Sequence, residues 1–291
     1  MLHRHILHND TIQEATAPVL SPSQVGLLSG WGVFTTLRIA DGVLFAFERH
    51  WARIARDAAA FHVPIPADPE KVRGKLLELV EANGAQDSTM RLVIVRNSGG
   101  MWANPSPERP SDLIALTADS KDWGHDVKLA YQTNGRHADS PFAGTKILSW
   151  SMNLTWLENA QSCGFDEVIL LNERGEVAEC TAANVFAVAG GRVLTPPLTS
   201  GCLEGVTRGV LLELAPQLGI PMEERTLKPE DLRRADELFI SSTNRNLIGV
   251  GTLEEHTYAG APGPITRRLE EAFAGYVADY IAKAAAAPVR R

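Results

Sequence analysis

The chain has 291 residues, 44% of them hydrophobic and 22% charged, with a formal net charge of −7. This length allows a sizeable core, in one large domain or two. The negative charge and the absence of a Lys/Arg cluster argue against a nucleic-acid partner. No apolar signal follows Met1, and the three cysteines stand in unrelated contexts, so we expect a cytoplasmic protein without membrane contacts.

The first half of the chain combines strands and helices. Strand-like segments run to about Ile39 and turn at Asp41-Gly42. Apolar residues at helical spacing predict helices at about 48–61 and 69–83. Strands are predicted at Met90–Val95 and Leu113–Leu116. The Gly/Pro-rich loop between them, Ser98 to Pro110, is long enough to indicate a function.

A polar, charged stretch from Asp119 to Asp126 separates this half from the next. We therefore predict a small N-terminal α/β domain at 1–120, a linker at 121–126 and a larger C-terminal domain at 127–291. The second domain is predicted to start with the strand Val127–Tyr131 and to contain a helix at about 205–218. A terminal helix is predicted at about 264–286, followed by a frayed end.

An acid lies between two apolar runs in this second half. Val168–Leu171 precedes a turn at Asn172–Gly175, and Val185–Val188 runs into Gly190-Gly191, so the segment reads as paired strands with Glu179 between them. A carboxylate there is a solvated residue, a structural ion pair, or a group held against a cofactor.

Six segments, in this order, resemble the class IV aminotransferases, which are pyridoxal-phosphate enzymes of the type IV fold. They span nearly the whole chain: Gly30-Trp-Gly-Val-Phe-Thr-Thr-Leu-Arg38, His50-Trp-Ala-Arg53, Ala143-Gly-Thr-Lys-Ile-Leu-Ser-Trp150, Gly175-Glu-Val-Ala-Glu-Cys-Thr-Ala-Ala-Asn-Val-Phe186, Gly201-Cys-Leu-Glu-Gly-Val-Thr-Arg208 and Ala235-Asp-Glu-Leu-Phe-Ile-Ser-Ser-Thr243. The resemblance implies an α/β (α+β) fold of two domains with the active site between them. It also implies pyridoxal 5′-phosphate as cofactor and a homodimer, in which we expect the loop Ser98 to Pro110 to cross or cap the site.

The resemblance makes Lys146 the lysine that forms a Schiff base with the cofactor and then moves the substrate proton. Taken alone, it would read as a solvent-reaching lysine at the start of a helix carrying Leu148, Met152 and Leu154. Glu179 then corresponds to the acid that faces the pyridine nitrogen. Glu176 is its neighbour, and we expect it to point to water.

Phosphate binding is the next implied role. Gly205 precedes a helix start where the N–H groups of Val206 and Thr207 are available to an anion, although the same pattern also fits a plain helix start. By resemblance, Arg53 and Thr243 are further phosphate contacts.

Two positions depart from the family pattern. Ser149-Trp150 stands where many members have Asn-Tyr, so the tyrosine hydroxyl that bonds O3′ of the cofactor is missing. Gly30-Trp31-Gly32 replaces the usual Gly-Asp-Gly, and Trp31 either shapes a pocket wall or covers the core.

Substrate choice is less defined by the sequence. Arg38, Arg96 and Arg136 are candidates for binding a substrate carboxylate, with surface ion pairs as the alternative. Phe34, Trp150 and Asn244 complete the candidate substrate contacts. We expect small-molecule substrates, an amino acid of branched-chain type and a 2-keto acid. The alternatives are aminodeoxychorismate lyase and D-amino-acid aminotransferase activity.

No metal site is predicted. His3, His5 and His8 alternate as in an exposed strand and lack acidic or thiol partners.

Overall fold

The computed structural model of the protein describes residues 1–100 and 108–286. Its contacts divide the chain into two compact units, which are described separately. The first unit contains Met1–Lys121, Lys146–Trp150 and the residues from Val277 onward, and the second contains Asp122–Thr145 and Ser151–Tyr276. The first break lies within the predicted linker, whereas the five residues that begin with Lys146 pack in the first unit.

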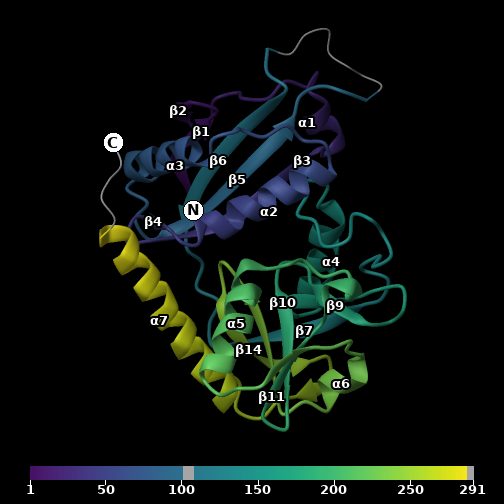
Figure 1. The fold of residues 1–291 in the computed structure, drawn as a ribbon. Coiled ribbons are helices and arrows are strands. Elements are labelled where there is room, and N and C mark those ends of the chain that lie inside the picture. The colour runs from purple at the N-terminus through teal and green to yellow at the C-terminus, as the bar shows by residue number, and fades with distance from the viewer. Residues whose placement is uncertain (101–107, 287–291) are drawn as a thin grey trace. The chain divides into compact units, whose positions relative to one another are not determined.

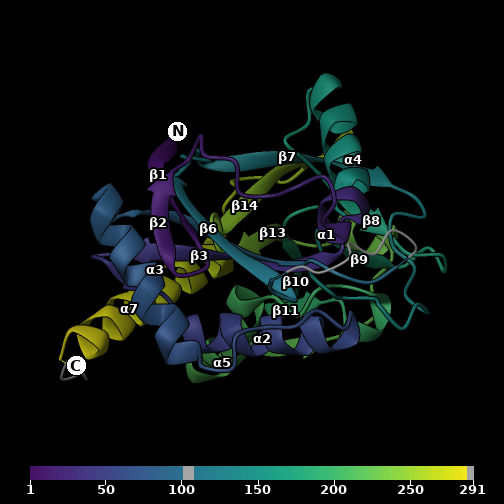
Figure 2. The same cartoon turned by 90° about the horizontal axis from the view of Figure 1, so that it is seen from above.

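The first unit is an antiparallel sheet with helices on one face (Figures 1 and 2). The strand order is β2-β1-β6-β5-β3-β4. In chain order, the elements are β1 Leu2–His8, β2 Thr11–Glu14, α1 Val25–Ser29, β3 Gly32–Ala40, β4 Val43–Leu44, α2 Phe47–Ala60, α3 Pro69–Asn83, β5 Ser88–Arg96 and β6 Ser111–Asp119. The predicted helices and strands of this half are confirmed. Residues 101–107 of the predicted loop lie outside the described residues.

The core of the first unit forms where α2 and α3 cover the sheet. Ile54 and Leu76 from the two helices pack with Val33, Leu37 and Leu92 from the strands, and each is at most 1% exposed. The boundaries of α3 follow from local chemistry. The Asp68 side chain accepts hydrogen bonds from the first N–H groups, and Gly84 ends the helix with a left-handed φ of 59°.

The second unit is built on a nine-stranded sheet, with the path β12-β11-β10-β13-β14-β7-β8-β9 and β15 paired to β14. It is mixed, because β7 runs parallel to both β14 and β8. The elements are β7 Asp126–Gln132, α4 Ser151–Ser162, β8 Glu167–Leu171, β9 Val177–Cys180, β10 Asn184–Ala189, β11 Arg192–Thr195, the 3-10 helix η1 Leu198–Ser200, α5 Val206–Gln217, β12 Met222–Glu224, α6 Pro229–Arg233, β13 Glu237–Ser242, β14 Asn246–Leu253 and β15 His256–Thr257. The last helix, α7, runs from Pro264 to Ala286, as predicted, and Val277 is its first residue in the first unit.

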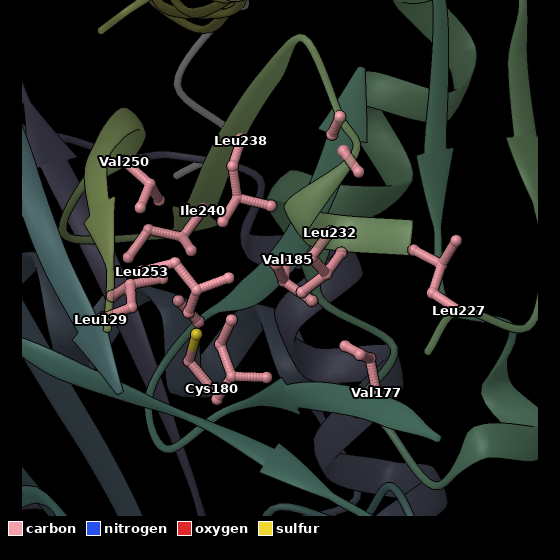
Figure 3. Close-up of a cluster of buried hydrophobic side chains, with 14 of the residues drawn as sticks. Leu129, Val177, Cys180, Val185, Leu227, Leu232, Leu238, Ile240, Val250 and Leu253 are labelled. Atoms are coloured by element: carbon pink, nitrogen blue, oxygen red, sulfur yellow. The ribbon is translucent and has the colours of Figure 1, made fainter. Parts of the chain in front are cut away.

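Strand alternation decides which side chains of the second unit are available to a site. Leu238 and Ile240 of β13 point into the hydrophobic core of the second unit, a cluster of buried side chains that also contains Leu129 and Val185 (Figure 3). Phe239 therefore points to the opposite face, where its ring stacks on Phe186 with centroids 4.7 Å apart. Ser241 follows on that same face.

The prediction of a helix led by Lys146 is wrong. Helix α4 begins at Ser151, and Lys146 lies in an extended segment before it. Met152 and Leu154 are 62% and 52% exposed, so they form no buried face. Competing backbone bonds explain the difference, because the Lys146 segment pairs with a strand far away in sequence.

The remaining expectations concern single side chains. Glu176 does not point to water: its carboxylate accepts hydrogen bonds from Asn172 and Arg174. His3 and His5 lie beside Thr117 and Asn83. Among the described residues, no three side chains form a metal-binding group, and no helix is long and apolar enough to cross a membrane.

Candidate active site

The backbone around Lys146 is fixed by two elements of the first unit, β3 and α2. Ile147 forms an antiparallel bridge with Val33 at the start of β3. The Lys146 carbonyl accepts the N–H of Phe34 at 3.1 Å, and the Lys146 N–H donates to Oδ2 of Asp57 at 3.0 Å. The lysine thus extends from a rigid base although no regular helix or strand contains it.

The ammonium group of Lys146 lies against two aromatic rings. Its Nζ is 4.5 Å from the ring centroid of Phe34 and 5.9 Å from that of Trp150, and these two rings pack edge to face. The Arg91 guanidinium also lies over the Phe34 ring, at 4.6 Å. Partial desolvation lowers the pKa of Arg91, although the residue as a whole is exposed. Two cations therefore share one aromatic surface, which attracts both through the electron density of the rings.

A buried polar group lies on the other face of β3, where α2 covers the sheet. Thr35 Oγ1 accepts a hydrogen bond from Arg53 Nη2 and lies 2.8 Å from His50 Nδ1. Arg53 Nη2 also lies 3.5 Å from this nitrogen. Burial, with the charges of Arg53 and Lys146, lowers the pKa of His50 well below its usual value. His50 is therefore neutral, and its Nε2 is buried without a partner among the described residues.

In the second unit, the carboxylate of Glu179 is held at both oxygens. Oε1 accepts Arg136 Nε at 2.8 Å, and Oε2 accepts the backbone N–H of Leu203 at 3.0 Å. Arg136 also donates to Asn153 Oδ1, and Asn153 donates to the Thr181 carbonyl. Hydrogen bonds of this kind hold the carboxylate of Glu179 in one position.

A candidate anion cradle lies next along the chain. It consists of Asn184, Leu203, Gly205, Val206, Thr207 and Ser241. Leu203 gives its N–H to Glu179, and its carbonyl accepts Asn184 Nδ2 at 2.8 Å. A Cβ added to Gly205 would collide with Asn184 Oδ1, although the φ of −69° is open to any residue. A larger residue would therefore have to displace the Asn184 side chain, whose amide is bound to the Leu203 carbonyl.

Helix α5 begins at this glycine. Gly205 is its N-cap and gives no side-chain cap, so the first N–H groups, including those of Val206 and Thr207, are available to an anion. Thr207 is 3% exposed. Ser241 pairs with Asn184 across β13 and β10, so their side chains share a face, and its buried Oγ has no partner among the described residues.

The other predicted residues have different surroundings. Arg136 contacts Glu179, as described above. The guanidinium of Arg96 donates to the carbonyls of Ser98 and His62 and lies over the ring of Trp31. Trp31 itself packs against the hydrophobic core of the first unit. Arg38 shares a face of β3 with Phe34. The turn after β13 contains Thr243, which is half-buried, and Asn244, which is exposed.

Comparisons with known proteins identify the family of the chain. Residues 32–253 match the model of the family described as "Amino-transferase class IV". A Methanocaldococcus jannaschii protein named "Putative branched-chain-amino-acid aminotransferase" is 32% identical over 85% of this chain and 88% of its own. The D-alanine aminotransferase of Bacillus licheniformis is 27% identical over 96% of this chain and 99% of its own. The structure of Escherichia coli branched-chain amino acid aminotransferase matches with a TM-score of 0.86 and 26% identity, covering 94% of each chain.

The structure has the type IV fold of pyridoxal-phosphate enzymes. The chain belongs to the class IV aminotransferase family. The predicted family, α/β fold class, enzymatic activity and cofactor are thereby confirmed. The anion cradle of the second unit fits the cofactor phosphate, because it offers an uncapped helix start and a buried hydroxyl without a partner.

Sequence reasoning missed several residues of these networks. Arg91 was not among the named arginines, and Asn184 was named only within the segment Gly175–Phe186 that resembles the family. His50, Arg53 and Asp57 share the buried face of α2, at positions i, i+3 and i+7. Polar residues at core positions of a helix are the signal that could have identified Asp57.

Proposed function

We propose that this enzyme transfers the amino group of an L-amino acid with an apolar, branched-chain-type side chain to a 2-keto acid. The placement of the Lys146 ammonium against the Phe34–Trp150 pair carries this proposal, because the aromatic wall favours an apolar side chain. Arg91, over the same ring, supplies positive charge for a substrate carboxylate. The branched-chain aminotransferases among the relatives support the same substrate class.

Pyridoxal phosphate, when bound, supplies an aldehyde for the lysine and a ring that withdraws electrons from the substrate α-carbon. With the cofactor bound, Lys146 Nζ would take the proton from this carbon and deliver it to C4′ of the cofactor, the former aldehyde carbon. Glu179, held by Arg136 and Leu203, stays negative and keeps the proton on the pyridine nitrogen. Removal of either group would therefore act on proton transfer.

Binding of the cofactor phosphate is assigned to a separate set of groups. The backbone N–H groups of Val206 and Thr207 and the hydroxyl of Thr207 bind the dianion at the start of α5. Arg53 and Thr243 add charge and a further hydroxyl. Because these groups are distinct from Lys146 and Glu179, cofactor affinity and turnover should respond to different substitutions.

A half-reaction identifies the substrate. Enzyme loaded with the cofactor is mixed with L-leucine, L-glutamate, D-alanine or D-glutamate, each without a keto acid, and the visible absorption is followed. We expect the band of the lysine-bound cofactor to disappear with L-leucine or L-glutamate. Disappearance with the D-amino acids alone would support the D-amino-acid activity, which the likeness to D-alanine aminotransferase favours. No change with any of the four, together with release of pyruvate and 4-aminobenzoate from aminodeoxychorismate, would identify a lyase.

We also propose that the enzyme is a cytoplasmic homodimer. Cys163, Cys180 and Cys202 are all free thiols in the structure, which fits a reducing compartment. The homodimer rests on the family resemblance, and light scattering coupled to gel filtration tests it. A monomer that retains full turnover would contradict it.

A further inference from the structure

Asp57 is a buried carboxylate outside the residues assigned so far. It lies in α2, and its side chain is 1% exposed. Oδ2 accepts the backbone N–H of Lys146 at 3.0 Å. Oδ1 accepts Arg56 Nη2 at 2.9 Å and Nε at 3.1 Å. A charged group this deeply buried costs free energy unless donors surround it, so its contacts account for its presence.

The backbone groups of Lys146 are held from opposite directions. The carbonyl is bound by Phe34 of β3, and the N–H is bound by Asp57 of α2. The β3 bridge alone leaves the residue before Ile147 able to rotate about its backbone. The second contact fixes that rotation, and with it the direction in which the Cα–Cβ bond of Lys146 points.

Helix α2 also contains Arg53, four residues before Asp57. Residues at this spacing share a helix face, and the axial rise between them is about 6 Å. Both side chains belong to the buried face of α2. One rigid helix therefore supplies the proposed phosphate-binding arginine and the group that holds the lysine backbone.

We propose that Asp57 is a positioning residue for Lys146: by accepting the lysine's backbone N–H, it sets the direction from which the amine reaches the reacting carbon. This inference rests on the proposed role of Lys146. It predicts that the acceptor oxygen of Asp57 matters more than its charge.

Three substitutions separate the acceptor from the charge. Asp57→Asn loses the charge but keeps an acceptor oxygen for the Lys146 N–H when its NH₂ faces Arg56, whose 43% exposed side chain can turn toward solvent. Asp57→Ala removes both acceptor and charge, and Arg56→Ala removes a donor to the other oxygen while the acceptor stays. Asp57→Ser, too short to span the contact, serves if the alanine variant does not fold. Two quantities are measured: the rate at which cofactor-free protein attaches pyridoxal phosphate to a lysine, trapped with borohydride, and kcat and KM of the reaction with the best amino acid.

We expect Asp57→Ala and Asp57→Ser to slow attachment and lower kcat about 10- to 100-fold, as a misplacement of about 1 Å does, while KM changes less than about 3-fold. Asp57→Asn and Arg56→Ala should stay within about 5-fold of the wild type. Wild-type attachment and kcat in the alanine or serine variant would overturn the proposal. An asparagine variant as slow as these would also overturn it, because charge would then be the active feature.

The proposed function is tested separately in the same samples. If borohydride fixes the cofactor of the wild-type protein to another lysine, the role of Lys146 is wrong and Asp57 has nothing to position. If it fixes the cofactor to Lys146 in every variant, and all variants have wild-type rates, only the role of Asp57 is wrong.

Discussion

The two proposed catalytic residues are held in opposite ways. The first unit binds the backbone of Lys146, through Phe34 and Asp57, and leaves the side chain to rest on aromatic rings. The second unit binds the side chain of Glu179, at both carboxylate oxygens. Hydrogen bonds thus fix the main chain of Lys146, whereas hydrogen bonds fix the charged atoms of Glu179.

This difference matches what each group must do. A lysine that leaves the cofactor and moves a proton needs a mobile side chain on a fixed base, and ring contacts restrain an ammonium less directionally than hydrogen bonds do. An acid that keeps the pyridine nitrogen of the cofactor protonated needs a constant charge and position, and two hydrogen-bond donors provide this. The four predictions below test this contrast, from the largest expected effect to the smallest.

Lys146 should be indispensable for the chemistry. Lys146→Ala should lower kcat by about 1000-fold or more, because no other base is assigned to the substrate proton. The variant should still retain the cofactor, as measured by absorbance after gel filtration, because the groups that bind the cofactor phosphate are unchanged. Lys128→Ala is the control, since Lys128 is an exposed lysine of β7. A Lys146→Ala enzyme with a tenth of normal turnover would contradict the assignment.

Glu179 should be sensitive even to glutamine, a substitution that keeps the shape of the side chain. Glu179→Gln should lower kcat about 100-fold, because the amide NH₂ must face either Arg136 or the Leu203 N–H, both of which are donors. Isotope effects with α-deuterated substrate should show that proton abstraction has slowed. Glu176→Gln, which alters the carboxylate beside Arg174, should leave kcat within about 2-fold. Equal effects of the two substitutions would refute the special position of Glu179.

The anion cradle should depend on one close contact. Gly205→Ala places a methyl group against Asn184 Oδ1, so we expect cofactor affinity to fall about 10-fold in an equilibrium titration. Gly74→Ala is the control, because a Cβ at this position of α3 meets nothing within 4 Å. The control should bind cofactor normally and unfold at higher temperature, since alanine favours a helix by about 0.5–1 kcal/mol. Unchanged cofactor affinity in Gly205→Ala would count against the cradle.

The neutral state of His50 predicts a small pH effect on the cofactor-free protein. Its pKa in the folded protein is lowered, so the unfolded chain binds a proton near pH 6.5 that the folded protein does not. Stability should therefore fall as the pH drops below about 6.5, by about 1 kcal/mol at pH 5.5 for this one residue. Urea unfolding at pH 7.5 and 5.5 measures the loss. His50→Gln should remove that share of it, and His137→Gln, which alters a mostly exposed side chain, should not.

Regular elements and their borders could be predicted where local chemistry decides them. The capping residue Asp68 and the stop at Gly84 place α3, and the turn residues around Gly175 and Gly190-Gly191 place the strands beside Glu179. The surroundings of Lys146 could not be predicted in this way. Its helical pattern is a local signal, and the bridge to Val33 overrides it through contacts distant in sequence.

Side-chain partners escaped prediction for the same reason. Arg136 was one of three candidates for a substrate carboxylate, with an ion pair as the alternative, and the structure shows an ion pair with Glu179, 43 residues further along the chain. A charge in a sequence does not show which opposite charge folding brings to it. Asp57 and Lys146 are 89 residues apart, and no short motif contains both.

The position of the Lys146 segment also matters for how the protein reaches its active state. The residues that hold Lys146 belong to the part of the chain before Lys121, whereas the lysine itself comes after it. A fragment cut at this break would therefore contain either the lysine or its anchors, but not both. Closing so long a loop is slow and costs entropy, so the anchoring contacts are expected to form late in folding. Covalent attachment of the cofactor would then act as a chemical reporter of the completed fold.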